Sequence, residues 1–147
     1  MRPALFLDRD GTINYDPGYV HKLEDLKLFD DIVPIIKEYN QKGFFVLVLT
    51  NQSGINRGYF TEKELNAFNE AIKKELTAKG AIIDAFYYCP HRPDENCNCR
   101  KPKTGLIELA LKDFDIDVKN SIIIGDRDNF EGEMARRLGI AYKILKR

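Results

Sequence analysis

Five short, mostly apolar segments are separated by longer stretches in which apolar residues recur three or four positions apart. The short segments are residues 4–7, 44–49, 82–88, 121–126 and 141–145. Apolar runs of this length without polar alternation are typical of strands buried on both faces of a parallel sheet. The segment 82–88 gives the weakest signal, because Asp84 interrupts it.

Helical spacing marks the intervening segments, which are approximately residues 32–43, 61–80, 106–114 and 134–138. Asp30 and Asp31 are candidate caps for the first helix, and Thr61 with Glu64 forms a capping-box pattern for the second. Strands that alternate with helices predict an α/β fold. We therefore expect one domain over residues 1–147, built as a three-layer α/β/α, doubly wound, mostly parallel sheet.

The composition and net charge limit the kinds of molecule that the protein is expected to bind. The chain has 147 residues, of which 44% are hydrophobic and 31% charged, as in a folded globular protein with a single core. The 23 basic and 23 acidic residues cancel, so no overall field favours nucleic acid or an anionic membrane. There is no signal-peptide pattern, and no apolar run approaches the ~18 residues of a membrane span. We expect a cytoplasmic monomer whose partner is a small molecule.

Polar residues follow three of the predicted strands. Asp8 and Asp10 come directly after the first, Thr50 after the second and Asp126 at the end of the fourth. Taken alone, Asp8 to Gly11 also fits an ordinary surface turn. In a parallel sheet, however, the carboxyl ends of the strands meet at one edge, where ligands bind. The predicted topology therefore brings these residues together.

The gathered residues form a coherent set for phosphoryl transfer. Asp8 would attack phosphorus, and Asp10 would protonate the leaving oxygen and then deprotonate the hydrolytic water. Asp8, the backbone carbonyl of Asp10 and Asp126 could hold Mg²⁺, which prefers oxygen ligands. Thr50, loop amides and Lys101 could neutralise the oxygens of the transferred group.

The same residues resemble the motifs of the haloacid dehalogenase superfamily of phosphatases. The matching motifs are Asp8-Arg9-Asp10-Gly11-Thr12, Thr50-Asn51-Gln52, Lys101 and Gly125-Asp126, in the superfamily's order. The resemblance implies that Asp8 is the nucleophile and Asp10 the general acid/base. Many members have a second Asp shortly after the position of Asp126. Here Glu131 fits this looser acidic position and Asp128 is the alternative, so either of the two could support the magnesium ion.

All three cysteines fall in one polar loop. Cys89, His91, Cys97 and Cys99 supply three thiolates and one imidazole, a complete tetrahedral set for Zn²⁺. Such a closed site would be structural, and it would direct Arg100 and Lys101 toward the strand ends. The alternative is a turn with unligated cysteines.

The zinc loop and the second-strand loop together resemble the D-glycero-D-manno-heptose 1,7-bisphosphate 7-phosphatases. That resemblance implies substrate contacts by Asp16, Pro17, Gly18 and Tyr19, by Thr50, Asn51, Gln52 and Ser53, and by Arg100 and Lys101. Arg100 and Arg57 are candidates for reading a second phosphate, because Arg binds such oxygens in a bidentate manner. No segment is long enough for a large cap domain, so we expect a capless, open site.

Three other interpretations compete with this one. The histidinol-phosphate phosphatases share the zinc loop, and their five-residue spacer and Gly-Asp-Arg motif resemble Cys89 to Cys99 and Gly125 to Arg127. A signalling receiver domain also phosphorylates an Asp at a strand end, although Asp10 and the zinc loop argue against it. A zinc-organised nucleic-acid binder is disfavoured by the neutral net charge.

Overall fold

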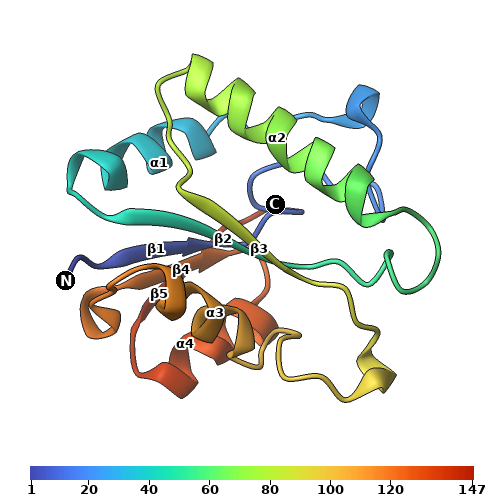
Figure 1. Ribbon diagram of the computed structural model, residues 1–147. Helices are drawn as coiled ribbons and strands as arrows, with labels where there is room; N and C mark the ends of the chain where they lie inside the picture. The colour runs from blue at the N-terminus through green and yellow to red at the C-terminus, as the bar shows by residue number, and fades with distance from the viewer.

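The computed structural model describes residues 1–147, and its centre is a five-stranded sheet (Figure 1). All neighbouring strands pair in parallel, in the order β3-β2-β1-β4-β5. The strands are β1 (Ala4–Leu7), β2 (Phe45–Asn51), β3 (Ala85–Cys89), β4 (Ile122–Gly125) and β5 (Ala141–Ile144). The prediction of a mostly parallel sheet is confirmed.

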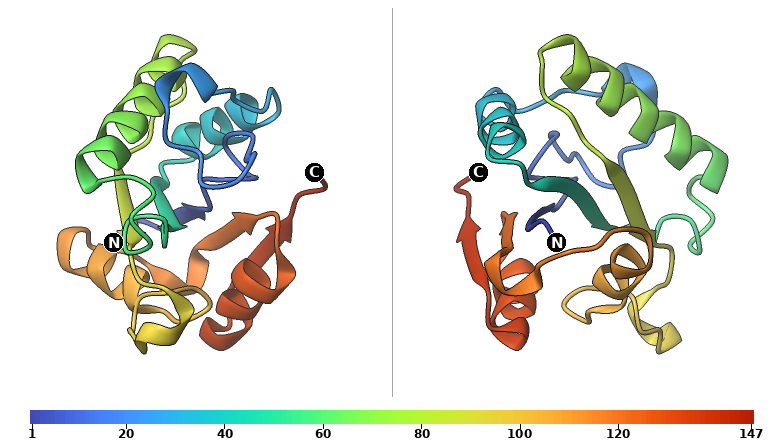
Figure 2. Two further views of the ribbon diagram at one scale, coloured as in Figure 1. Left: turned by 90° about the vertical axis from the view of Figure 1, so that its right-hand side faces the viewer. Right: turned by 60° about the vertical axis from the view of Figure 1, so that its left-hand side comes forward.

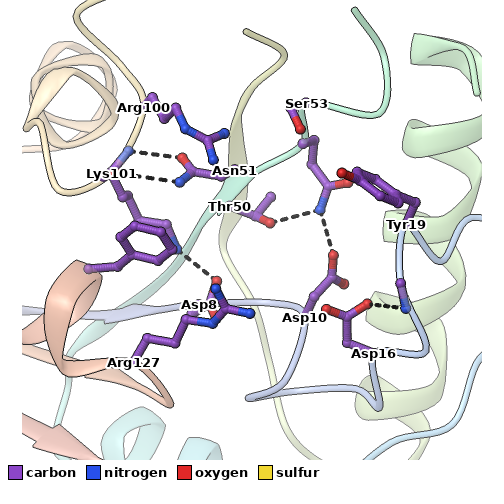
Figure 3. Close-up of a pocket in the computed structure, with 13 residues that line it drawn as sticks. Asp8, Asp10, Asp16, Tyr19, Thr50, Asn51, Ser53, Arg100, Lys101 and Arg127 are labelled. Carbon is purple, nitrogen blue, oxygen red and sulfur yellow. Dashed lines mark hydrogen bonds and ion pairs between the residues drawn. The ribbon is translucent and has the colours of Figure 1, made fainter. Parts of the chain in front are cut away.

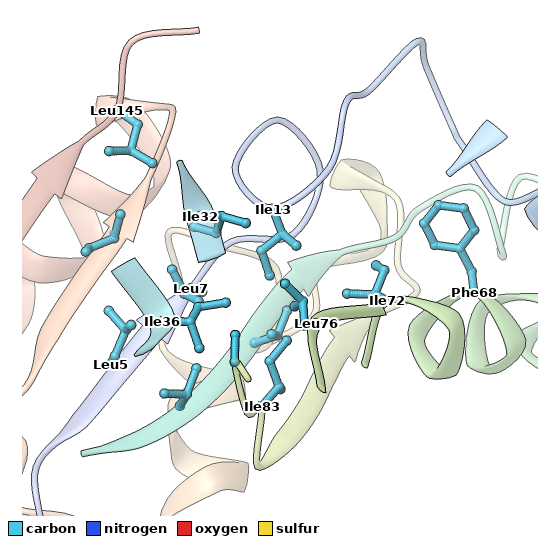
Figure 4. Close-up of a cluster of buried hydrophobic side chains, with 14 of the residues drawn as sticks. Leu5, Leu7, Ile13, Ile32, Ile36, Phe68, Ile72, Leu76, Ile83 and Leu145 are labelled. Atoms are coloured by element: carbon cyan, nitrogen blue, oxygen red, sulfur yellow. The ribbon is translucent and has the colours of Figure 1, made fainter. Parts of the chain in front are cut away.

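Helices cover both faces of this sheet, as Figures 1 and 2 show. On one face lie α1 (Ile32–Gln41) and α2 (Glu62–Ala78), and on the other α3 (Gly105–Asp113) and α4 (Glu133–Leu138). Successive side chains of β1 enter opposite cores: Leu5 and Leu7 join the first cluster, and Ala4 and Phe6 the second. Figure 4 shows the first cluster, between the sheet and α1 and α2. The three-layer, doubly wound architecture is therefore confirmed.

The two predicted caps have different outcomes. Thr61 and Glu64 form the reciprocal capping box at the start of α2, with Thr61 Oγ1 accepting from the Glu64 amide at 3.1 Å. Asp31 occupies the N-cap position of α1, but its side chain makes no capping bond. The expectation that it caps this helix is wrong, because its carboxylate binds the Arg147 guanidinium at 2.8 Å instead.

The third strand begins later than the hydrophobic pattern suggests. Ile82 lies outside the strand and is 42% exposed, and pairing starts at Ala85. Asp84, the residue that interrupts the apolar run, bonds to β2: its amide donates to the Val46 carbonyl and its carboxylate accepts from the Val46 amide, both at 2.8 Å. The polar residue therefore aligns β3 with β2 rather than breaking the strand.

The register of the strands determines where the predicted functional residues lie. Leu7 lies opposite Val48 of β2 and Ile124 of β4, so Asp8 leaves the sheet between β2, which continues to Asn51, and the end of β4. The chain winds outward through β2 and β3 and then returns to the other side of β1 with β4. Ligands commonly bind at such a switch point. The left view of Figure 2 looks onto this edge of the molecule.

No helix has the length and apolar character needed to cross a bilayer.

Candidate active site

Lys101 is the centre of a buried charge cluster at the end of β1. Its ammonium lies 2.7 Å from Asp8 Oδ1 and 2.9 Å from Glu131 Oε2, and it donates to the Leu49 carbonyl at 2.8 Å. The side chain is only 2% exposed. Burial alone would lower the pKa of Lys101, but the carboxylates of Asp8 and Glu131 outweigh it and raise that pKa. Lys101 therefore stays charged beside the predicted nucleophile.

Three carboxylates form an acidic group around the same point. One oxygen each of Asp8, Asp126 and Glu131 lies within 4.8 Å of the others. Burial, reinforced by the charge of Asp8, raises the pKa of Asp126 to about 6. Burial also raises the pKa of Glu131 to about 7, against the opposing effect of Lys101. These three acids share the single ammonium of Lys101, so a second positive charge among them would lower their mutual repulsion.

Glu131 provides a direct test of whether a metal fits. Its side chain is 1% exposed, and neither carboxylate oxygen accepts a hydrogen bond of good geometry, although Oε2 lies beside the Lys101 ammonium. Buried polar atoms without such bonds are rare in folded proteins. The donor set is entirely oxygen, which suits Mg²⁺. The residues present therefore fit the predicted metal.

Two glycines make room for these acids. A Cβ on Gly125 would collide with the Glu131 side chain, and one on Gly11 would collide with the Asp126 carboxylate. Gly11 also has a φ of +84°, in the left-handed region that favours glycine. The glycine of each motif is thus required by the neighbouring carboxylate.

Asp128, the competing acid, lies on the surface. Its carboxylate binds the Arg136 guanidinium at 3.1 and 3.2 Å and is not part of the acidic group. Asp128 and Glu131 belong to a five-residue π-helical turn, Asp128–Gly132, between β4 and α4. This turn directs Glu131 inward and leaves Asp128 outside.

Asp10 is held from several directions on the other side of Asp8. Its Oδ1 accepts from Arg9 Nε at 2.8 Å and from Asn14 Nδ2 at 3.1 Å. Its Oδ2 accepts from Gln52 Nε2 at 2.9 Å, and the same amide donates to Thr50 Oγ1 at 2.8 Å. Figure 3 shows this chain of contacts from β2 to the first motif.

A cavity of about 320 Å³ opens above these residues (Figure 3). Eleven of the thirteen residues that line it were predicted from the sequence: Asp8, Asp10, Asp16, Gly18, Tyr19, Thr50, Asn51, Gln52, Ser53, Arg100 and Lys101. The other two, Arg127 and Phe130, were not. Arg127 directly follows Asp126 and could have been identified from that position, whereas Phe130 carries no comparable sequence signal.

Two predicted substrate contacts do not line this cavity. Pro17 is absent from the lining although its neighbours Asp16 and Gly18 belong to it. Arg57 is exposed; it donates to Ser53 Oγ at 3.0 Å and lies over the Tyr19 ring at 5.9 Å. Arg57 is thus next to the rim of the cavity and touches two of its lining residues.

The four predicted zinc ligands converge within one loop. The Sγ atoms of Cys89, Cys97 and Cys99 and the Nδ1 atom of His91 all lie within 4.8 Å of one another. His91 Nδ1 is 3.4 Å from Cys89 Sγ and 3.3 Å from Cys99 Sγ. Three sulfurs and one imidazole nitrogen around one point fit a tetrahedral Zn²⁺.

The cysteine loop contacts the loop after β2, and the segment that follows it contacts β2 itself. Glu95 accepts from Asn56 Nδ2 at 2.8 Å, which connects the cysteine loop to the loop after β2. Asn51 accepts from the Lys101 amide at 2.9 Å and donates to the Lys101 carbonyl at 3.3 Å. Both backbone groups of Lys101 are therefore fixed against β2.

Comparison with known proteins identifies the family. A family model described as polynucleotide kinase 3 phosphatase matches residues 5–139. A probable D-glycero-D-manno-heptose-1,7-bisphosphate 7-phosphatase of Thermoplasma acidophilum is 50% identical over 142 residues, which span 97% of this chain and 89% of that protein. The D-glycero-beta-D-manno-heptose-1,7-bisphosphate 7-phosphatase of Haemophilus ducreyi is 39% identical, over 99% of this chain and 84% of its own.

The chain belongs to the D-glycero-D-manno-heptose-1,7-bisphosphate 7-phosphatase family of the haloacid dehalogenase superfamily.

A solved member of the heptose bisphosphatase family has the same fold. The D,D-heptose 1,7-bisphosphate phosphatase of B. bronchiseptica, crystallised with magnesium and phosphate, superposes with a TM-score of 0.86. It is 30% identical, and the match covers 98% of this chain and 80% of that one. The predicted superfamily and phosphatase activity are confirmed, and the heptose bisphosphatase interpretation is favoured over the histidinol-phosphate one.

Proposed function

We propose that this phosphatase removes the 7-phosphate of D-glycero-D-manno-heptose 1,7-bisphosphate through a phosphorylated Asp8. The observation that best supports this proposal is the arrangement at the end of β1, where Asp8 lies beside the Lys101 ammonium and the carboxylates of Asp126 and Glu131. The chain is also 50% identical to a relative named for this reaction. A strand-end nucleophile beside a fixed cation suits transfer of an anionic group.

The first step forms a bond between an Asp8 carboxylate oxygen and phosphorus and breaks the bond from phosphorus to the sugar oxygen. Asp10 gives its proton to that departing oxygen. Lys101 and Thr50 also line the cavity and would donate to the oxygens of the transferred group. The product alcohol leaves, and Asp8 carries the phosphoryl group.

The second step returns the enzyme to its starting state. Asp10, now ionised, takes a proton from water as the water oxygen attacks phosphorus. The bond between phosphorus and Asp8 breaks, and inorganic phosphate leaves. The hydrogen bonds from Arg9, Asn14 and Gln52 keep the Asp10 carboxylate in one orientation for both transfers.

Asp8, the backbone carbonyl of Asp10, Asp126 and Glu131 would hold Mg²⁺. The buried Glu131 oxygens and the raised pKa of Asp126 support this assignment. When bound, the ion would offset the repulsion between these acids and the substrate phosphate. Asp128 is not assigned to the metal, because Arg136 already binds its carboxylate on the surface.

Arg100 and Arg127 would bind the second phosphate. Both line the cavity, and guanidinium groups bind phosphate oxygens through two parallel hydrogen bonds. Arg57 and Pro17 stay predicted contacts at the rim. Asp16 and Tyr19 lie across the cavity from these arginines (Figure 3), and with Gly18, which also lines the cavity, they would face the sugar hydroxyls.

Zn²⁺ on the cysteine loop would have a structural role. All four ligands come from the protein, which leaves no open position for chemistry. The loop contains only one short helical turn, Pro93–Glu95, so bound zinc would hold the segment that leads to Arg100 and Lys101. The monomeric state and the cytoplasmic location stay predictions.

A substrate comparison tests the proposal. Purified protein is assayed for phosphate release from the heptose bisphosphate and from histidinol phosphate, with and without Mg²⁺. We expect release from the heptose ester that requires Mg²⁺, with a kcat/KM at least about 100-fold above that for histidinol phosphate. Equal turnover of both esters, or faster turnover of histidinol phosphate, would refute the substrate assignment. Activity without added metal would refute the magnesium requirement.

A further inference from the structure

Arg9, between the two acids of the first motif, is completely buried. Its exposure is 0%, and it is the largest fully buried side chain in the protein. A charged group out of water is costly unless it is paired and fully hydrogen-bonded. Nothing in the two-step reaction assigns it a part, since a side chain with no exposure cannot touch the substrate.

The Arg9 guanidinium grips both oxygens of the Asp10 carboxylate. Nε donates to Oδ1 at 2.8 Å, and Nη2 donates to Oδ2 at 3.2 Å. This is the two-pronged geometry that a guanidinium can make and an ammonium cannot. The plane of the carboxylate is therefore fixed by Arg9.

The rest of the guanidinium is anchored to α2 and to the loop before α1. Nη1 donates to Asn69 Oδ1 at 2.9 Å, and Nη2 also donates to the Val20 carbonyl at 3.4 Å. The Phe68 ring lies 4.7 Å from the guanidinium carbon, close enough for a cation–π contact. Asn69 is itself only 5% exposed, so a buried polar residue of α2 faces the buried charge.

We propose that Arg9, anchored by Asn69 and Phe68, is a positioning residue that sets the orientation of Asp10 for proton transfer. The proposal rests on the proposed function of Asp10 as general acid and base. It makes α2 part of the catalytic apparatus, although the helix begins at Glu62 and contributes no residue to the cavity lining.

A comparison of leaving groups separates this role from a purely structural one. Hydrolysis of an alkyl phosphate needs a proton on the leaving oxygen, whereas p-nitrophenolate leaves readily without one. kcat/KM reports the steps up to phosphorylation of Asp8, which include this proton transfer. Loss of Asp10 orientation should therefore lower kcat/KM more for the alkyl ester than for p-nitrophenyl phosphate.

The main variant is Arg9→Lys, which keeps the charge and removes the two-pronged grip. We expect kcat/KM to fall about 100-fold with the heptose bisphosphate and about 5-fold or less with p-nitrophenyl phosphate. Arg2→Lys is the matched control, because Arg2 also stacks on a ring, that of Phe45, and donates to a carbonyl, that of Gly43. The ratio of the two kcat/KM values should not change in this control.

Asn69→Leu provides a second variant that keeps Arg9 and removes one anchor. We expect the same selective loss, about 5-fold to 10-fold in the ratio, and this variant carries the test should Arg9→Lys fail to fold. Equal proportional losses on both esters, or no loss on either, would overturn the proposal and leave Arg9 a residue of the core. Circular dichroism and melting temperature establish the folded state of each variant.

Failure of the proposed substrate is distinguishable from failure of this inference. Wild-type protein that hydrolyses p-nitrophenyl phosphate and fructose 1,6-bisphosphate with Mg²⁺ but not the heptose ester would refute the substrate alone. The leaving-group ratio is then measured with fructose 1,6-bisphosphate as the alkyl phosphate, and the same outcomes decide the role of Arg9.

Discussion

The two ligand clusters of this protein are assembled in opposite ways. The acidic group around Asp8 draws on residues 8, 126 and 131, with Lys101 between them, and exists only when β1, β4 and the following turn are in place. The cysteine cluster lies within residues 89–99. The first is a product of sheet topology, and the second is a property of one loop.

The difference in assembly suggests different roles, with the acidic group serving catalysis and the cysteine cluster serving stability. The oxygen ligands are crowded and incompletely hydrogen-bonded, an arrangement that costs folding energy and suits a catalytic ion. The sulfur and nitrogen ligands form a closed set in a segment with little secondary structure, where bound Zn²⁺ would contribute folding energy. Changes to the two clusters should therefore have different consequences.

The largest effect is expected from Asp8→Asn. Loss of the nucleophile should reduce phosphate release by about 10⁴-fold or more, measured as kcat with the heptose bisphosphate. The fold should survive, because Lys101 keeps Glu131 as a partner at 2.9 Å. Asp128→Asn is the control, and we expect its activity to stay within about 2-fold of wild type, because Asp128 contacts Arg136 on the surface. A fully active Asp8→Asn protein would contradict the assignment of Asp8 as the nucleophile and of the acidic group as the catalytic cluster.

Cys97→Ser should act on stability first. Removing one of four zinc ligands should lower the free energy of unfolding by about 3 kcal/mol or more, measured by urea denaturation of zinc-loaded protein. Activity should fall with it, because Arg100 and Lys101 follow the loop. Asp94→Asn changes an exposed residue of the same loop that is not a ligand, and it should leave the unfolding curve in place. Coincident curves for Cys97→Ser and wild type would show that zinc has no structural role.

A pH effect should reveal the cost of the acidic group. The pKa of Asp126 is raised to about 6 and that of Glu131 to about 7, both chiefly by burial, from ordinary values of 3.8 and 4.5. Between about pH 4 and pH 7 the native state therefore binds more protons than the unfolded chain, and stability falls as pH rises. In magnesium-free buffer the two shifts together correspond to a free energy of unfolding about 4 kcal/mol lower at pH 8 than at pH 5. Because Asp126 is only half-buried and solvent screens its charge, we expect a fall of about 2–4 kcal/mol.

Glu131→Gln sharpens this pH experiment. The variant cannot ionise at this position, so its unfolding free energy should change less between pH 5 and pH 8. Mg²⁺ should restore the stability of wild-type protein at pH 8, since the ion would bind the ionised carboxylates. A wild-type protein that becomes more stable from pH 5 to pH 8 without magnesium would contradict the raised pKa values.

The smallest effect is expected outside both clusters. Thr61→Ala removes the capping box of α2 and should lower the free energy of unfolding by about 1 kcal/mol, measured by thermal denaturation. The kcat/KM value should stay within about 2-fold of wild type, because Thr61 belongs to neither ligand cluster and does not line the cavity. Loss of activity beyond this range would show that the start of α2 is coupled to the cavity.

The strand ends were predictable because parallel pairing imposes a common edge. Asp8, Thr50 and Asp126 each follow an apolar run, and the topology alone brings them together. Long-range side-chain partners were not predictable in this way. Asp31 has the sequence position of a helix cap, but the distant Arg147 takes its carboxylate. Local pattern indicates what a residue can do, and tertiary contacts select among the possibilities.

The π-helical turn at Asp128–Gly132 shows a second limit. The superfamily pattern left Glu131 and Asp128 as competitors, because its second acid follows the position of Asp126 at a loosely defined distance. The direction of each side chain depends on the extra residue in the turn, which no local propensity signals. Arg9 was missed for a similar reason, since a charged residue beside two acids gives no indication of complete burial.

The all-parallel sheet also has a practical consequence for attachment. β1 begins at Ala4 on the side of the sheet away from the cavity, and Met1 is 81% exposed. Arg147, in contrast, donates to the Gly11 and Thr12 carbonyls beside the first motif. An affinity tag or a surface tether joined at residue 1 should leave substrate entry free, whereas the same fusion at residue 147 would pull on the backbone next to the nucleophile.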